Sequence, residues 1–345
     1  MSAPATSNPK NRFLSTEVEW ADDAPPPPAD LEFIEDHTRN ILSTNDSPDI
    51  GFTWSVNPYR GCFHGCTYCY ARPTHEYLGL GAGTDFERKI VVKPKAGELL
   101  REAFEKPSWK GELLVFSGVT DCYQPAEAQW KLTRACLSVC AEYRNPVGII
   151  TKGPLIERDL DLLLALHERA SVQMSVSIPL WDREHSHAVE PYCATPQRRM
   201  ETVRRLAAAG LRVGVNVAPL IPGLGDEDIV RVLEAAKDAG AESVGSIFLR
   251  LPGAVAQVFE QRLVQLLPLR AEGILHKIRD ARGGKLNDPR FGNRQRGEGP
   301  HAQAAMMLFK QTAKRLGLRM HMFATDPVKQ TFTRPERRGA QMKLF

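Results

Sequence analysis

The chain has 345 residues, of which 42% are hydrophobic and 25% charged, the composition of a globular protein with one large or two ordinary domains. No run approaches the roughly 20 apolar residues that span a bilayer, and no basic-then-apolar secretory signal opens the chain. We therefore expect a cytoplasmic protein without a membrane partner. Three of the seven cysteines lie within eight positions, which argues against a disulfide framework and indicates metal ligands.

The net charge of +4 is distributed unevenly along the chain. Residues 1–50 carry a net charge of −7, residues 51–269 are balanced, and residues 270–345 carry +11. A basic C-terminal region can bind a polyanion such as a nucleic acid, or it can pair with the acidic N-terminal region. The sequence leaves both alternatives open.

Composition and periodicity divide the chain into three parts. Residues 1–45 are rich in Pro, Asp, Asn and Ser, which predicts a flexible, disordered or extended, acidic arm. Residues 46–270 contain the regular pattern described next. Residues 271–345 form a basic, helical C-terminal extension, with a helix over 270–282, a Gly- and Arg-rich loop over 283–300 and a helix over 302–316.

Within residues 46–270, short apolar runs alternate with helical patterns. The predicted strands are 52–56, 113–116, 147–150, 172–178, 213–217 and 244–249, and the predicted helices are 125–143, 155–167, 196–209, 226–239 and 255–267. Such alternation is typical of parallel βαβ units. Six units predict an α/β fold with a partial (β/α)6 barrel, short of the eight units that close a barrel. Parallel sheets place their chemistry at the carboxyl ends of the strands.

The loop after the first predicted strand contains three cysteines, Cys62, Cys66 and Cys69, with the spacing Cys-x3-Cys-x2-Cys. Three thiolates on one tight loop can hold three corners of an iron–sulfur cube, whereas four would saturate it. The open fourth iron can then bind a substrate. Gly61 and Gly65 let the loop wrap closely around such a cluster.

Zinc is the alternative occupant, with His64 or a remote cysteine as the fourth ligand. Zinc sites usually combine two Cys-x2-Cys pairs, and the sequence has no second pair. Cys136 and Cys140 are four residues apart on a predicted helix and are interpreted as core positions. His64 and His75 are interpreted as loop or capping residues.

The cysteine triad, with the aromatic Tyr68 before its third cysteine, resembles the signature of the radical S-adenosylmethionine (SAM) superfamily. The likeness extends over residues 50–270, because the strand–helix alternation also fits the six-unit partial barrel of that superfamily. The resemblance implies a 4Fe–4S cluster whose open iron chelates SAM. It further implies reductive cleavage of SAM to a 5′-deoxyadenosyl radical, which abstracts hydrogen from a substrate.

The resemblance also assigns residues at later strand ends to SAM, with Tyr68 beside the cluster. The residues expected to contact the amino group of SAM are Ser117, Thr120 and Asp121, and Lys152 is expected to contact its carboxylate. Ser175 and Ser177 are assigned to the ribose or carboxylate, and the adenine is assigned to Leu220, Ile221 and Gly223. Each has a plainer alternative: Asp121 can begin a turn, and Lys152 can be a solvated surface residue.

Within the superfamily, the Tyr-Arg-Gly-Cys loop and the Ser-Gly-x-Thr-Asp-x-Tyr-Gln-Pro segment resemble relatives of spore photoproduct lyase. That lyase splits a thymine dimer and uses a cysteine ahead of the strand-end Asp as hydrogen donor. Gly118 occupies the corresponding position here, which makes dimer repair doubtful. Cys122, which follows Asp121, is a candidate hydrogen donor, with a buried packing role as the alternative.

Two functions from different classes remain. The first is a radical enzyme that acts on a nucleic acid or a nucleotide, with a flavodoxin or ferredoxin as electron donor. The Arg- and Phe-containing loop 290–296 favours it, since arginines contact phosphates and an aromatic ring stacks on a base. Arg250, after the sixth strand, either binds an anionic group or forms a structural ion pair. The second function is a non-catalytic or electron-carrying iron–sulfur protein.

Overall fold

Six parallel strands in chain order form the centre of the computed structural model, which describes residues 7–13, 30–320 and 329–336. The strands are β3 (Trp54–Val56), β6 (Leu114–Phe116), β7 (Val147–Thr151), β8 (Val172–Ser177), β9 (Val213–Leu220) and β10 (Ser243–Phe248). Each strand pairs in parallel with the next one along the chain. These are the six strands that the sequence predicts, and the predicted α/β fold with a partial barrel is confirmed.

Two short strands extend this sheet to eight. β2 (Leu42–Thr44) pairs antiparallel with β3 at one edge, and β11 (Arg319–Met320) pairs parallel with β10 at the other. The strand order β11-β10-β9-β8-β7-β6-β3-β2 does not close on itself within the described residues. The sheet is therefore a partial barrel, open between its two edge strands.

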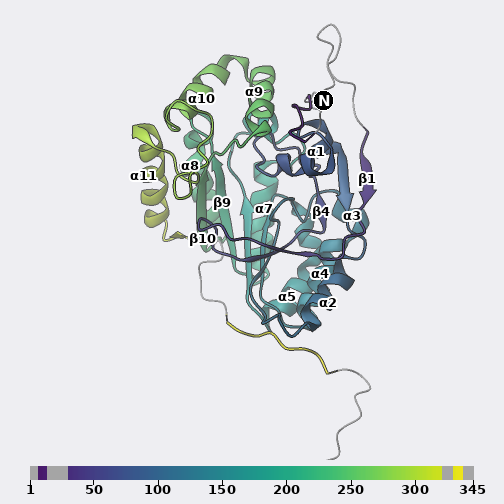
Figure 1. Ribbon diagram of the computed structural model, residues 1–345. Coiled ribbons are helices and arrows are strands. Elements are labelled where there is room, and N and C mark those ends of the chain that lie inside the picture. The colour runs from purple at the N-terminus through teal and green to yellow at the C-terminus, as the bar shows by residue number, and fades with distance from the viewer. Residues whose placement is uncertain (1–6, 14–29, 321–328, 337–345) are drawn as a thin grey trace, which may run out of the picture.

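Helices surround the sheet, and Figure 1 shows them on both flanks of the central strands and, for α1, α9 and α10, above one end of the strands. They are α1 (Thr84–Arg88), α2 (Ala96–Glu105), α3 (Ala126–Trp130), α4 (Leu132–Glu142), α5 (Leu160–His167), α6 (Arg183–Val189), α7 (Pro196–Ala208), α8 (Ile229–Asp238), α9 (Ala254–Leu266), α10 (Pro268–Asp280) and α11 (Gly299–Arg315). Short 3-10 turns are η2 (Arg72–Leu78), η3 (Pro154–Asp159) and η4 (Asp226–Asp228). In the described ranges no helix is long and apolar enough to cross a bilayer.

The helix predicted over 125–143 is divided into α3 and α4. Lys131 adopts a left-handed conformation, with φ of 54°, and separates the two. The buried carboxylate of Glu127 then accepts hydrogen bonds from the amides of Thr133 and Arg134 at the start of α4. A local side-chain cap thus overrides the continuous apolar pattern that predicts one helix.

The expected N-terminal arm is partly integrated into the folded body. β1 (Glu32–Glu35) pairs in parallel with β5 (Lys89–Val92), which also pairs antiparallel with β4 (Tyr59–Arg60) in a separate three-stranded sheet. β1 and β2 are extended segments within the first 45 residues, so the folded body begins before the predicted boundary at residue 46. Residues 1–6 and 14–29 of the arm lie outside the described residues.

The predicted C-terminal extension also packs on the core. Helix α11 lies beside α8, and β11 completes one edge of the sheet. Residues 329–336 contact the opposite side of the barrel, where Phe332 packs on Phe104 and Tyr143. The Thr333 amide donates to the Tyr143 carbonyl at 2.9 Å. The extension is therefore attached to both ends of the sheet.

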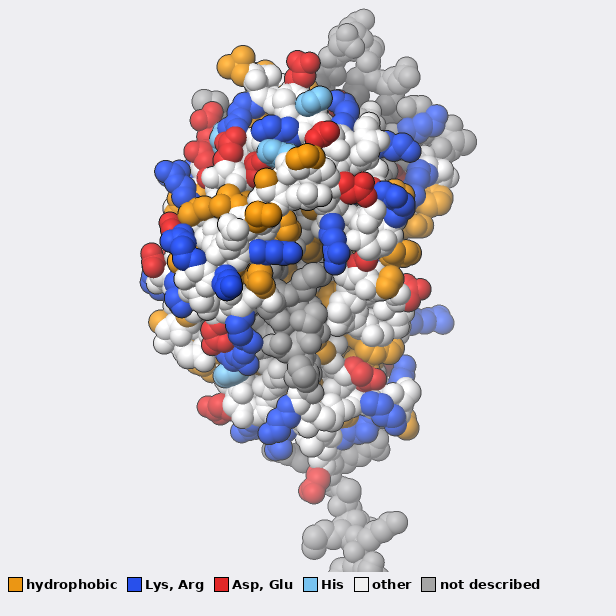
Figure 2. All heavy atoms as spheres, turned by 90° about the vertical axis from the view of Figure 1, so that its left-hand side faces the viewer, with side chains coloured by type: hydrophobic (Ala, Val, Ile, Leu, Met, Phe, Trp, Pro, Cys, Tyr) orange, Lys and Arg blue, Asp and Glu red, His pale blue; other side chains and the backbone are white. Residues whose placement is uncertain are grey.

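The basic residues of the extension do not gather into a single patch on the face formed by α8, α10 and α11. Figure 2 shows lysine and arginine side chains there scattered among acidic and hydrophobic ones. Several pair with neighbours, such as Arg315 with Glu234 at 2.7 Å. Among the residues that the structure describes, the basic side chains of residues 270–345 thus do not define a polyanion surface on this face.

We expect Phe332→Ala to lower the free energy of unfolding by about 1–2 kcal/mol, because it removes a ring packed against two buried aromatics. Leu269→Ala is the control, since Leu269 is 100% exposed and its loss should change stability by less than about 0.5 kcal/mol. Urea unfolding followed by circular dichroism measures both. Equal stabilities for the two variants would show that the terminal segment does not stay on the core.

Candidate functional site

The three cysteines of the predicted triad line one cavity of about 310 Å³ at the carboxyl ends of the strands. The chain reaches this loop from β4, and the Cys62 amide donates to the Phe86 carbonyl at 2.9 Å. The amide of Cys69 donates to the Cys66 carbonyl, which makes the loop a tight turn. Cavities of this size and position in α/β folds commonly hold cofactors.

Glycine is required at the entrance to the loop. Gly61 has φ of 77°, and a Cβ atom there would lie 2.8 Å from the His75 ring and 2.9 Å from the Phe86 carbonyl. Any side chain would therefore be strained and would collide with backbone. His75 is buried in this contact and its Nε2 lies 2.9 Å from the Lys89 carbonyl, so it has a structural role.

Arg72 fastens the loop from behind. Its fully buried guanidinium donates to the carbonyls of Cys66 and Gly65, each at 2.9 Å, and to those of residues 82–83. Its charge is balanced by Glu87 at 2.5 Å. Because Arg offers five donors in a rigid plane, one side chain can fix the loop carbonyls together.

The spacing of the cysteine sulfurs tests the two candidate occupants. A tetrahedral zinc ion with bonds of about 2.3 Å requires its sulfur ligands to lie about 3.8 Å apart. Among the described residues, Cys62, Cys66 and Cys69 are not a group whose sulfurs all lie within 4.8 Å of one another. At least one pair of these sulfurs is therefore farther apart than a single tetrahedral zinc ion allows, which argues against zinc held by all three cysteines as they are arranged here.

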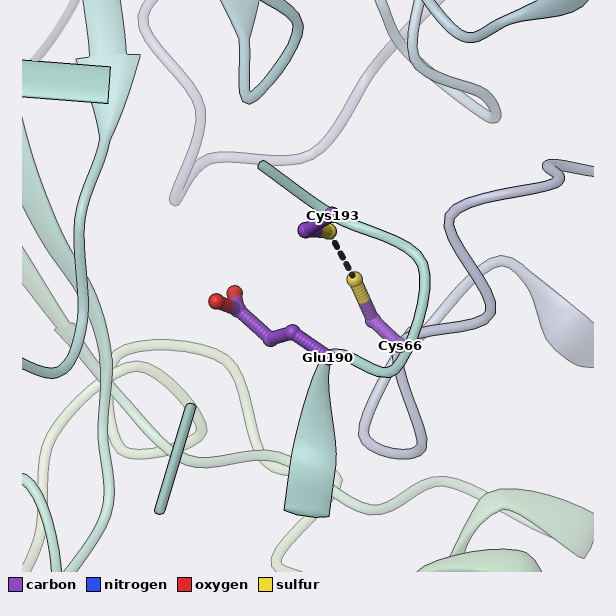
Figure 3. Close-up of side chains that lie close together, drawn as sticks. All are labelled: Cys66, Glu190 and Cys193. Atoms are coloured by element: carbon purple, nitrogen blue, oxygen red, sulfur yellow. Dashed lines mark hydrogen bonds between the residues drawn. The ribbon is translucent and has the colours of Figure 1, made fainter. Parts of the chain in front are cut away.

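A compact group of potential metal ligands does exist among the described residues. It consists of Cys66, which also belongs to the triad, with Glu190 and Cys193. Figure 3 shows the sulfurs of Cys66 and Cys193 facing each other, with the Glu190 side chain to the left of the pair; the two sulfurs are 3.6 Å apart. The contact with Cys193 lowers the pKa of the Cys66 thiol to about 7. Burial instead raises the pKa of Cys69 to about 12, so metal binding there must release a proton.

Glu190 is not free to bind a metal, because four side chains already hold it. Arg199 forms an ion pair with it at 2.5 Å, both side chains being fully buried. The Tyr68 hydroxyl donates to it, Ser186 does so at 3.2 Å, and Lys152 Nζ lies 3.9 Å away. Although burial opposes it, the charges of Cys66 and Glu190 raise the pKa of Lys152. Lys152 thus remains cationic at the cavity wall.

The segment after β6 contributes a second polar wall. Ser117 has φ of 86°, and its Oγ accepts the Cys122 amide at 3.0 Å, which compensates the strained backbone. The Thr120 hydroxyl donates to the Gly61 carbonyl at 2.6 Å and accepts from Gln124. Ser117 and Thr120 both line the cavity beside Asp121.

Asp121 is held as a carboxylate by its surroundings. Burial acts to raise its pKa, but His64, the Thr151 hydroxyl and the Lys152 amide together lower that pKa to about 2. His64 Nδ1 lies 3.4 Å from Asp121, and although burial opposes it, Cys62 and Asp121 raise the pKa of the imidazole. His64 is therefore part of the cavity wall and not only a loop residue.

Several residues assigned by resemblance lie away from the cavity. Ser177 lines it, whereas Ser175 is buried without lining it. Leu220 and Ile221 are fully buried in the core, and Gly223 packs against the Lys277 side chain, so none of the three borders the cavity. Cys122 is also fully buried and does not border it, an environment that suits its alternative role in packing.

The structure adds lining residues that sequence reasoning missed. They come from strand ends, from the N-terminal region and from the C-terminal loop, and are Thr151, Asn216, Ser246, Asp49, Ile50, Gly51, Phe52 and Gln295. Asn216 and Ser246 are polar side chains within apolar strands, and this signal was available in the sequence. The contribution of residues 49–52 was not, because no local pattern indicates which loop covers a cavity.

The N-terminal and C-terminal regions meet at Asp49, a residue that lines the cavity. Arg294 donates to Asp49 at 2.5 Å, and the Gly292 amide donates to the same carboxylate at 2.7 Å. Both charged side chains are largely buried. Of the two alternatives that the charge distribution left open, pairing between the acidic and basic regions occurs at this point.

The fold and the cysteine loop agree with a match to the radical SAM superfamily model over residues 56–236. The chain therefore belongs to the radical SAM superfamily. Its fold is that of spore photoproduct lyase: a mutant of that lyase is 17% identical and aligns with a TM-score of 0.60, covering 84% of this chain and 81% of the other. The lyase in complex with a dinucleoside spore photoproduct aligns with a TM-score of 0.58 at 15% identity, covering 84% and 81%.

Relatives with higher identity carry no assigned activity in their names. The uncharacterized protein Rv2578c of Mycobacterium tuberculosis is 40% identical over 207 residues, which cover 59% of this chain and 61% of the relative. The uncharacterized protein MJ0683 of Methanocaldococcus jannaschii is 27% identical, covering 58% and 72%. The chain thus spans about three fifths of the length of the mycobacterial relative.

We expect Arg72→Met to lower the free energy of unfolding by about 3–5 kcal/mol, because Glu87 is left buried without its partner. The iron bound after reconstitution should fall several-fold as the loop loosens. Arg101→Met is the matched control, since the exposed pair of Arg101 with Glu142 contributes about 0–1 kcal/mol. Urea unfolding of iron-free protein and iron analysis provide the measurements. Wild-type iron content in Arg72→Met would contradict the role given to this guanidinium.

Proposed function

We propose that this chain is a radical SAM enzyme whose Cys62, Cys66 and Cys69 hold a 4Fe–4S cluster. The observation that carries the proposal is the convergence of these three cysteines on one cavity in a chain of this superfamily. When bound, the reduced cluster supplies the electron that cleaves the sulfonium bond of SAM and so starts hydrogen abstraction from a substrate. The remaining steps depend on how the cavity binds and shields its contents.

The charges of the cavity wall suit the zwitterionic methionine part of SAM. The anionic side is Asp121, which stays ionised and lies beside the hydroxyls of Ser117 and Thr120, all acceptors for an ammonium group. The cationic side is Lys152, which can meet a carboxylate. Asp121 also accepts the Lys152 amide at 2.7 Å, which fixes the two sides relative to each other. These residues would orient SAM against the cysteine loop.

The segment over residues 49–52 would keep water away from the reaction. It borders the cavity and is held there by the buried pair of Asp49 with Arg294. A radical reaction benefits from such enclosure, because weakly bound hydrogen atoms of other molecules, such as those of thiols, would otherwise quench the radical in side reactions. Reduction requires an external one-electron donor, and a small flavodoxin or ferredoxin is the class of protein we propose for it.

The test of the enzyme proposal is reductive cleavage of SAM. Reconstituted, dithionite-reduced protein should form 5′-deoxyadenosine from SAM, measured by chromatography and mass spectrometry. Cys66→Ala should lose both the cluster and the product, since it removes a ligand. Cys140→Ala, which alters a buried cysteine on α4, should retain both. An intact cluster without 5′-deoxyadenosine would leave a non-catalytic or electron-carrying iron–sulfur protein as the function.

We further propose that the substrate carries a phosphate or another anionic group, as a nucleotide or nucleic acid does. Arg250 supports this class, because its side chain borders the cavity and its buried Nε has no hydrogen-bond partner in the described part of the chain. Burial and the neighbouring charge of Arg294 both lower the pKa of Arg250. A substrate anion would relieve an unpaired buried cation of this kind.

Binding to a short single-stranded oligodeoxynucleotide tests the substrate class. Affinity should fall with increasing salt, and Arg250→Gln should reduce the slope of log affinity against log salt by about 1. Arg101→Gln, on an exposed surface pair, should leave the slope unchanged. Salt-independent or absent binding by wild-type protein would exclude a nucleic-acid substrate, and an unchanged slope in Arg250→Gln would exclude phosphate contact by Arg250.

A further inference from the structure

Cys193 is a cysteine without a role in the proposed reaction. It follows helix α6 and does not border the cavity, and the three cysteines of the loop suffice as cluster ligands. Yet its sulfur lies 3.6 Å from that of Cys66, closer than any other sulfur–sulfur contact recorded for the described residues. Figure 3 shows the two side chains approaching from separate segments of the chain, with no group between the sulfurs.

Backbone hydrogen bonds on both sides of this pair hold the two segments together. The Thr67 amide donates to the Val189 carbonyl at 2.9 Å, and the Tyr192 amide donates to the His64 carbonyl at 3.3 Å. The 3.6 Å separation exceeds a disulfide bond of about 2.05 Å by only about 1.5 Å. The sulfurs thus have only a short distance to close, and the two backbone hydrogen bonds hold the segments that carry them next to each other.

We propose that Cys193 is a resolving cysteine, which forms a reversible disulfide with Cys66 when the protein is free of its cluster and meets hydrogen peroxide. In the first step one thiol of the pair attacks peroxide, the O–O bond breaks, and a sulfenic acid and one water form. The second thiol then attacks the sulfenic sulfur, an S–S bond forms, and a second water leaves. Two thiols are thereby oxidised by two electrons in total, and one peroxide is reduced to two waters.

The consequence concerns the cluster ligand. A sulfenic acid without a neighbouring thiol is oxidised further to sulfinic acid, which thiol reductants do not reverse. Cys193 would trap Cys66 at the reversible stage, so that reduction restores a ligand able to rebind iron. The disulfide and the cluster exclude each other, because both need the Cys66 sulfur. This consequence rests on the proposed ligand role of Cys66, whereas formation of the disulfide does not.

The experiment uses full-length, iron-free protein treated with hydrogen peroxide. Wild-type protein should lose about 2 Da in intact mass, and peptide mapping should find Cys66 linked to Cys193. Dithiothreitol should then restore both thiols and at least about four fifths of the iron bound on reconstitution. In Cys193→Ser the linked peptide cannot form, so Cys66 should gain about 32 Da as sulfinic acid, and dithiothreitol should not restore iron binding.

Two controls separate this inference from folding defects and from the enzyme proposal. Cys193→Ala and Cys193→Ser should bind wild-type amounts of iron before oxidation, and Cys140→Ala should behave as wild type throughout. Absence of the Cys66–Cys193 peptide in wild-type protein overturns the inference, as does full recovery of iron binding in oxidised Cys193→Ser. Peptide mapping needs neither iron nor SAM, so its result for the disulfide is independent of whether the protein cleaves SAM.

Discussion

The cysteine loop depends on one buried guanidinium. Arg72 joins two carbonyls of the loop to the chain at residues 82–83, and Glu87 neutralises it within the same enclosed space. A fully buried charge is costly unless it is paired and its donors are satisfied, and Arg72 meets both conditions through Glu87 and four backbone carbonyls. Gly61 adds a steric condition, since no side chain fits between the loop and its support. Together these contacts fix the backbone that carries the three thiols.

A second buried charge network joins the loop to the barrel. Glu190 accepts from Tyr68 on the cysteine loop and pairs with Arg199 on α7, which also donates to the Ser177 carbonyl at the end of β8. Lys152, at the end of β7, lies on the edge of the same network. The strand ends and the cysteine loop are therefore joined by one network of buried charges, and a change in one member would alter the others.

The acidic N-terminal region and the basic C-terminal region are joined by an ion pair beside the cavity. Asp49 and Arg294 pair beside the cavity, whereas the nearby Arg250 has a buried Nε without a hydrogen-bond partner among the described residues. Net charge alone could not distinguish these outcomes, because it counts charges without locating them. The substrate class that we propose depends on this one unpaired guanidinium more than on the overall basicity of residues 270–345.

The sequence by itself determined the six central strands and the cysteine triad, because strand periodicity and ligand spacing are local properties. It also placed Ser117, Asp121 and Lys152 at strand ends, since parallel strands end at one edge. Only the tertiary structure decided that Leu220 and Ile221 belong to the core, that residues 49–52 border the cavity, and that Cys193 lies against Cys66. Those outcomes join segments up to 245 residues apart, as for Asp49 and Arg294, and no local pattern encodes such contacts.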